Sequence, residues 1–144
     1  MSRSFLGLLA LPLLLAAPAT AFACECAQTA GFVKTAKSSP HVVVVQATGA
    51  RDGALQFDVV RVLKGGAVGE SITIAPGIGK SCNEPAGRFT SGQRYVLALP
   101  KVFEGQPLGT CKKRVADAAG GELQLKNGEK KTLDELQKSL NKVK

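Results

Sequence analysis

Four cysteines are the residues of this chain whose types and spacing point most directly to chemistry. Cys24 and Cys26 are separated by one residue, and Cys82 and Cys111 follow far along the chain. In an exported chain an even number of cysteines indicates disulfides. A Cys24–Cys26 bond would close a very small, strained ring, so we expect each of the two to pair with Cys82 or Cys111, in either order. A four-cysteine zinc site is disfavoured because the usual paired C-x2-C knuckles are missing.

The residues before Cys24 have the pattern of a secretory signal peptide. Arg3 supplies the positive charge, residues 5–17 form an apolar stretch rich in Leu, and Ala21-Phe22-Ala23 is a cleavage site. Cleavage after Ala23 makes Cys24 the first residue of the mature protein, with a free α-amine. Lipid attachment to Cys24 is disfavoured, because it usually requires Leu three residues before the cysteine and a small residue two before it. We expect a secreted or periplasmic protein without residues 1–23.

Composition and charge limit the classes of partner. The chain has 19 basic and 11 acidic residues among 144, a net charge of +8. This charge suggests attraction to an anionic polymer, but a solvated basic surface that supports solubility is the favoured interpretation. No aromatic run alternates with the basic residues, so we expect no nucleic-acid binding. No second long apolar stretch follows the leader, so we expect no membrane span.

Motifs for catalysis are missing from the sequence. His41 is the only histidine, and its position before a Val-rich run predicts a strand-edge residue rather than a general base. Gly79-Lys80-Ser81 has the end of a phosphate-binding loop, but Ile74 stands where an earlier glycine is required. Gly-x-Ser-x-Gly and His-Glu-x-x-His do not occur. We expect a protein that is not an enzyme, and that holds neither a cofactor nor a metal ion of its own.

The elements that must position the cysteines are mostly strands. Runs of β-branched and apolar residues between turn signals predict strands at residues 41–47, 55–63, 71–75, 94–99 and 108–113. Four successive valines at 42–45 are typical of a strand buried on both faces. Residues 28–37 have apolar residues at helical spacing and predict a short helix. Five short strands after an early helix favour a small closed barrel over a sandwich.

The C-terminal segment, residues 121–144, has a different pattern. Asn127-Gly128 predicts the turn of a small hairpin. Thr132 and Glu135 have the spacing of a capping box, and an apolar stripe behind them predicts an amphipathic helix. We expect this hairpin and helix to dock on a domain of residues 24–120.

The ordered motifs resemble the netrin-like domain, and most closely the tissue inhibitors of metalloproteinases and their bacterial relatives. The similarity rests on the Cys-x-Cys start, the Val-rich strand, Phe57-Asp58-Val59-Val60-Arg61-Val62-Leu63-Lys64-Gly65, Ser81-Cys82, Ser91-Gly92-Gln93-Arg94-Tyr95-Val96-Leu97-Ala98-Leu99 and Gly109-Thr110-Cys111. It covers roughly residues 24–111 and leaves the C-terminal hairpin and helix outside. It implies a mainly β fold, a five-stranded oligonucleotide/oligosaccharide-binding (OB) barrel. It also implies the disulfides Cys24–Cys82 and Cys26–Cys111.

The resemblance further implies an inhibitor whose tip is Cys24. The α-amine and carbonyl of this residue would chelate the catalytic zinc of a target metalloproteinase, so the zinc belongs to the partner. Glu25 would enter the specificity pocket of that enzyme, where animal members of the family usually place a small or hydroxyl residue. The competing hypothesis is a non-catalytic extracytoplasmic module that binds an anionic glycan or a protein. In that case Cys24 is only a disulfide anchor.

Overall fold

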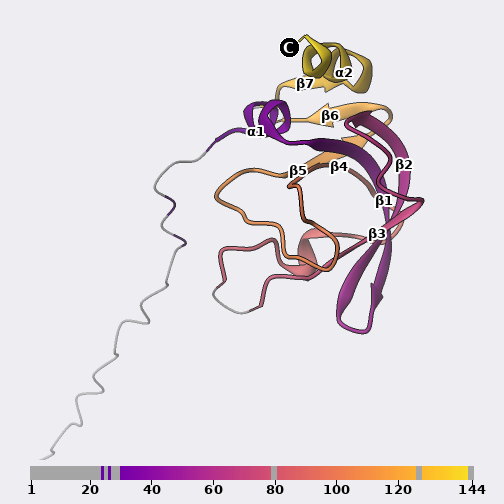
Figure 1. Cartoon of the computed structure of the whole chain (residues 1–144), viewed down its shortest axis with the longest axis vertical. Coiled ribbons are helices and arrows are strands. Elements are labelled where there is room, and N and C mark those ends of the chain that lie inside the picture. Colours follow the sequence, from indigo (N-terminus) through magenta and orange to yellow (C-terminus); the bar gives the residue numbers. More distant parts are fainter. Residues whose placement is uncertain (1–23, 25, 27–29, 79–80, 126–127, 143–144) are drawn as a thin grey trace, which may run out of the picture.

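A computed structural model describes residues 24, 26, 30–78, 81–125 and 128–142 of the chain. In this part of the chain one antiparallel sheet of seven strands has the order β3-β2-β1-β4-β5-β6-β7 (Figure 1). The elements are α1 (Phe32–Ser38), β1 (His41–Arg51), β2 (Ala54–Lys64), β3 (Ser71–Ile74), the 3-10 helix η1 (Ala86–Arg88), β4 (Arg94–Leu99), β5 (Val115–Ala119), β6 (Glu122–Gln124), β7 (Lys130–Thr132) and α2 (Leu133–Asn141). The protein is therefore mainly β, as the sequence predicts.

The sheet is open, so the prediction of a closed five-stranded barrel is wrong for the described residues. A loop lies along the edge strand β3: the Thr73 N–H donates to Glu104 Oε1 at 3.0 Å, and the Gly105 N–H donates to the Thr73 carbonyl at 2.8 Å. At the other side the β6–β7 hairpin extends the sheet beyond β5. Within the described chain the two edge strands, β3 and β7, therefore do not pair with each other.

The predicted fifth strand at residues 108–113 is also wrong, because the strand that follows β4 is β5, at Val115–Ala119. Residues 108–111 instead bond to the loop that contains Cys82. β5 pairs with β4 from Val115 opposite Leu97 to Ala118 opposite Arg94. Its alanines have little intrinsic strand preference, so this pairing and the burial of Ala116 and Ala118 determine its conformation.

The central strand β1 supplies both hydrophobic cores, because successive side chains of a strand point to opposite faces. Val42 and Val44 belong to the first core, which lies under α1 and α2, while Val43 and Val45 belong to the second core, on the other face. All four are at most 1% exposed, which confirms the prediction of a strand buried on both faces. The second core also contains the side chains of Leu55, Phe57, Ile72, Ile74, Tyr95, Leu97, Leu99 and Leu108.

The two helices lie together at one end of the molecule, and the tip of the β1–β2 hairpin lies at the other end (Figure 1). α1 begins at Phe32 after the N-cap Gly31, later than predicted, and the predicted positions 28–29 lie outside the described residues. The predicted capping box of α2 is present, because the Thr132 hydroxyl accepts from the Glu135 N–H and the Glu135 carboxylate accepts from the Thr132 N–H.

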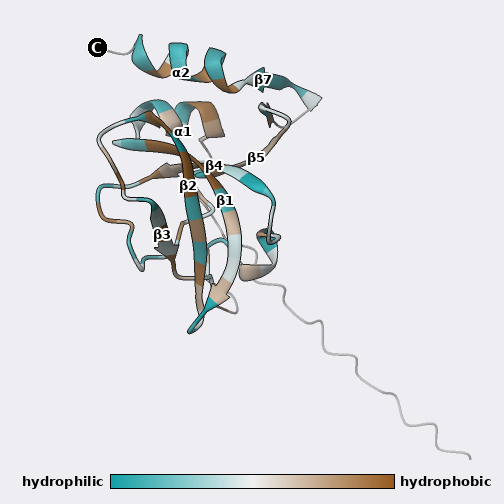
Figure 2. Ribbon diagram, turned by 90° about the vertical axis from the view of Figure 1, so that its right-hand side faces the viewer, coloured by the Kyte–Doolittle hydropathy of each residue, from teal (hydrophilic) through white to brown (hydrophobic). Residues whose placement is uncertain are grey.

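The apolar stripe of α2 faces inward, so the segment 121–142 continues the sheet and shares its first core. Leu136 and Leu140 are at most 1% exposed, together with Leu123 of β6. The helix accordingly alternates between hydrophilic and hydrophobic colours in Figure 2. Arg61 of β2 donates to the side chains of Asp134 and Gln137, which ties the exposed side of α2 to the sheet.

No helix in the described ranges is long and apolar enough to cross a membrane. The predicted signal peptide, residues 1–23, lies outside these ranges.

Candidate functional site

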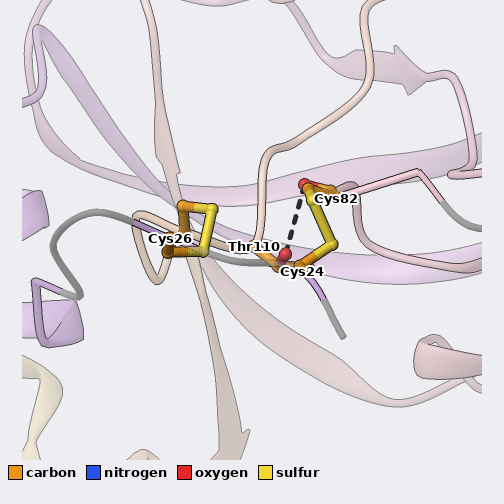
Figure 3. Close-up of a disulfide and its surroundings, with 5 residues drawn as sticks. Cys24, Cys26, Cys82 and Thr110 are labelled. Atoms are coloured by element: carbon orange, nitrogen blue, oxygen red, sulfur yellow. Dashed lines mark hydrogen bonds between the residues drawn. A yellow bond between two sulfur atoms is a disulfide. The ribbon is translucent and has the colours of Figure 1, made fainter. Parts of the chain in front are cut away.

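The N-terminal Cys-x-Cys is fixed by two disulfides that lie side by side (Figure 3). Cys24 is bonded to Cys82 with a Cα–Cα distance of 5.5 Å, and Cys26 to Cys111 with a distance of 5.3 Å. This is the pairing that the resemblance implies. Cys24 is exposed and Cys26 is half-buried. Glu25, the predicted specificity contact between them, lies outside the described residues.

Both disulfides end on a platform made of three loop segments, residues 75–77, 82–85 and 106–111. The Cys82 carbonyl accepts from the Thr110 N–H at 2.9 Å, and from the Thr110 hydroxyl at 3.1 Å. One step further, the Glu84 N–H donates to the Leu108 carbonyl at 2.7 Å. These bonds hold the two disulfide-bearing segments together like a short antiparallel ladder.

The first segment of the platform, residues 75–77, packs closely on the second, residues 82–85, because it contains Gly77. The Gly77 N–H donates to the Glu84 carbonyl at 2.8 Å. A Cβ atom at position 77 would lie 2.5 Å from the Asn83 carbonyl oxygen, so a larger residue would push the segments apart. The Ala75 N–H donates to the Gln106 carbonyl at 3.3 Å and joins the first segment to the last.

Close before α1 the chain is held again, next to the platform. Ala30 forms a parallel bridge with Lys112, and its carbonyl accepts from the Lys113 N–H at 3.4 Å. The N-terminal segment is therefore held at Cys24, Cys26 and Ala30. A chain fixed at three points loses little further conformational entropy when its exposed end binds a partner.

A groove of about 690 Å³ begins beside the platform and lies between α1, η1, β5 and the β6–β7 turn. Phe32, Val33, Val115 and Leu125 provide apolar walls, and charged side chains lie among them. Thr110 and Glu84 belong both to the groove lining and to the platform.

Arg88, Asp117 and Glu84 form a group of interacting charges in this groove. Arg88 donates two hydrogen bonds to the Asp117 carboxylate, at 2.7 and 3.0 Å, and its guanidinium lies 5.5 Å from the centroid of the Tyr95 ring. The hydrogen bond to Asp117 raises the pKa of Arg88 above its ordinary value. Partial burial raises the pKa of the Glu84 carboxyl, and this effect exceeds the opposing attraction of Arg88.

The loop that leads to Cys82 presents an exposed apolar side chain. Ile78 is 82% exposed, and its carbonyl accepts from the Ser81 N–H at 3.1 Å. Gly79 and Lys80 of the apparent phosphate-loop motif lie outside the described residues. Sequence reasoning missed Ile78 as a surface feature, since single apolar residues between glycines carry no periodic signal.

His41 lies at the start of β1. Its ring is 6.0 Å from that of Phe103, edge to face, and its Nδ1 atom is buried without a hydrogen-bond partner among the described residues. Among the described residues no group of three or more His, Cys, Asp or Glu side chains could hold a metal ion.

The comparisons with known proteins give no family assignment. No protein-family model matches this chain, and no curated protein matches it.

The sequence alone did not reveal the Arg88–Asp117 pair or Glu84 as part of a site. Arg88 and Asp117 meet only when η1 packs on β5, 29 residues further along the chain.

Proposed function

We propose that the mature chain is a secreted or periplasmic protein of the kind that the resemblance implies, an inhibitor of a zinc metalloproteinase. Cleavage after Ala23 would expose the α-amine of Cys24, which together with the carbonyl of the same residue can chelate zinc in a five-membered ring. The amine is a ligand once it is deprotonated, and its ordinary pKa of about 8 makes this accessible near a metal ion. It would take the open coordination position that the enzyme uses for water.

The observation that carries this proposal is the exposed Cys24 on the disulfide to Cys82. An inhibitory tip must be accessible and rigid at the same time. Exposure makes the residue accessible, and the disulfide, with the Thr110 hydrogen bonds behind it, supplies rigidity. The exposed Ile78 precedes Cys82 on the adjoining loop and offers an apolar contact to an enzyme surface.

We also propose that β1–β5 are a partly open relative of the OB barrel. The parallel bridge between Ala75 and Pro107 supports this, because it joins the end of β3 to the segment that precedes β5. Nuclear Overhauser contacts between these two segments in solution test the proposal, and their absence would remove it.

Adding one alanine before Cys24 tests the inhibitory tip. The mature protein should inhibit at least one enzyme in a panel of zinc metalloproteinases, and the extended protein none, because an amide nitrogen replaces the amine. A variant with one alanine added at the C-terminus is the control for length. Equal inhibition by the two N-terminal forms, or no inhibition by the mature protein, would contradict the proposal. Mass spectrometry of the exported chain measures the start at Cys24, lipidation and both disulfides.

Glu25 provides a test of specificity within the same proposal. A carboxylate is costly in an apolar pocket unless it is paired, so Glu25→Thr should strengthen inhibition of enzymes with apolar pockets. It should weaken inhibition of an enzyme whose pocket contains a basic residue. An unchanged order of preference across the panel would show that position 25 does not enter the pocket.

A further inference from the structure

Charge is distributed unevenly between the two ends of the molecule. One end consists of the two helices, β6–β7, the second half of β2 and the segment before β5. It carries eleven basic side chains: Lys34, Lys37, Arg61, Lys64, Lys112, Lys113, Arg114, Lys130, Lys131, Lys138 and Lys142. Its acidic side chains are Glu122, Glu129, Asp134 and Glu135. The rest of the described chain carries four basic and six acidic side chains. We call the first region the basic end.

Most acidic groups of the basic end already have partners within the protein. Asp134 pairs with Arg61 at 2.9 Å, and Glu122 with Lys130 at 3.6 Å. The Glu135 carboxylate accepts from the Thr132 N–H in the capping box, which lowers its pKa. Four acidic side chains against eleven basic ones still leave the basic end with a net charge of +7.

Four exposed lysines of the two helices are available to a ligand. Lys34 and Lys37 lie one turn apart on α1, and Lys138 and Lys142 lie one turn apart at the end of α2. Within the described chain their ammonium groups form no ion pair or hydrogen bond. α1 and α2 are in contact, so the two pairs lie on neighbouring helices at this end of the molecule.

This surface is suited to binding an anionic ligand rather than to insertion into a lipid bilayer. The apolar stripe of α2 is buried in the first core, with Leu136 and Leu140 at most 1% exposed. Phe32, the aromatic residue of α1, is 6% exposed. A membrane-surface helix needs an exposed apolar face, and recognition of bases needs exposed aromatic rings.

We propose that the basic end binds a sulfated or otherwise polyanionic polysaccharide through the lysines of α1 and α2. Repeated anionic groups along a flexible chain can reach both helices and neutralise several lysines at once. The driving force is the release of counterions, so the affinity depends strongly on salt. This surface does not involve the amine of Cys24, and the proposal is independent of protease inhibition.

Matched charge variants of the mature protein test the proposal with dextran sulfate as the probe and neutral dextran as its control. The wild type should bind dextran sulfate but not neutral dextran. Its affinity for dextran sulfate should fall about tenfold or more between about 50 and 200 mM salt. Lys34→Gln/Lys37→Gln and Lys138→Gln/Lys142→Gln should each weaken binding roughly tenfold. Arg94→Gln/Lys101→Gln removes the same charge outside the basic end and should change the affinity about twofold or less.

Three results would overturn the proposal. They are no binding of dextran sulfate, an equal loss in the Arg94/Lys101 control, and tighter binding to vesicles of anionic phospholipid than to dextran sulfate. The last would assign the basic end to a membrane surface. Circular dichroism of each variant excludes loss of folding, and an unchanged protease panel separates this surface from the tip at Cys24.

Discussion

The Cys82 carbonyl accepts two hydrogen bonds from a single residue, one from the N–H and one from the hydroxyl of Thr110. Thr110 directly precedes Cys111, so each disulfide is attached to a segment that also bonds to the other one. The two disulfides therefore act on one rigid unit rather than on two independent loops.

Thr110→Val keeps the shape of the side chain and removes the hydroxyl donor. Because the backbone bond to Cys82 remains, we expect a loss of about 0.5–1 kcal/mol in the free energy of unfolding. Thr110→Ser keeps the donor and should lose much less. Urea denaturation with both disulfides intact measures the difference, and equal losses in the two variants would contradict this role of the hydroxyl.

Removal of either disulfide should lower stability substantially. The bonds join residues separated by 58 and 85 positions, and each should contribute about 2–4 kcal/mol, the range typical of disulfides. The variants are Cys24→Ser/Cys82→Ser and Cys26→Ser/Cys111→Ser, compared by urea denaturation. A loss below about 1 kcal/mol in either would show that the platform bonds hold the N-terminus without that disulfide.

The two disulfides should also differ in reactivity toward thiols. Cys24 and Cys82 are exposed, whereas Cys26 and Cys111 are half-buried, and exchange requires access to a sulfur atom. Limited reduction by dithiothreitol followed by alkylation should therefore label Cys24 and Cys82 first. Mass spectrometry of the peptides measures the order, and simultaneous labelling of all four would contradict it.

Glu84 should make stability depend on pH. Since burial raises the pKa of the folded state, the folded protein binds the proton more tightly than the unfolded chain does. The contribution of Glu84 to stability is complete at pH values below its pKa in the unfolded chain, near 4.5. It is lost as the pH rises through its pKa in the folded protein. Glu84→Gln should therefore gain stability relative to the wild type on going from pH 4 to 7, by about 0.5 kcal/mol or less because the group is half-exposed.

Thermal unfolding at several pH values measures this effect. Glu70→Gln removes one exposed carboxylate from the loop before β3 and is the control for charge alone. A difference between wild type and Glu84→Gln that stays constant from pH 4 to 7 would remove the assignment to Glu84.

The capping box of α2 should contribute to the stability of the first core. Thr132→Ala removes the acceptor for the Glu135 N–H and should cost about 1 kcal/mol. Thr132→Ser, which keeps the acceptor, is the matched control. Hydrogen exchange of the α2 amides measures the effect locally, and equal exchange in both variants would show that core packing alone holds the helix.

Local patterns in the sequence predicted the parts of the fold that local chemistry determines. The valines at 42–45 predicted a strand buried on both faces, and Thr132 with Glu135 predicted the start of α2. The closed barrel was wrong because strand periodicity does not reveal that a loop near Glu104 covers β3. β5 was placed incorrectly because its alanines form a strand only through pairing with β4.

The candidate site divides in the same way. The spacing of Cys24 and Cys26 shows that both need distant partners, but it leaves two pairings open. The choice between them depends on which segments the fold brings together, as does the meeting of Arg88 with Asp117. These contacts join residues far apart in the chain, and no single stretch of sequence contains them.

The disulfide pattern has a consequence for the order in which the chain matures. Synthesis proceeds from the N-terminus, so Cys24 and Cys26 both appear before Cys82, and Cys111 appears last. Until then an external oxidant can join Cys82 to either of the first two thiols, and a Cys26–Cys82 bond leaves only Cys24 to pair with Cys111. Correct maturation therefore depends on a delay in oxidation or on a disulfide isomerase, and yields in its absence should be lowered by a Cys26–Cys82 species.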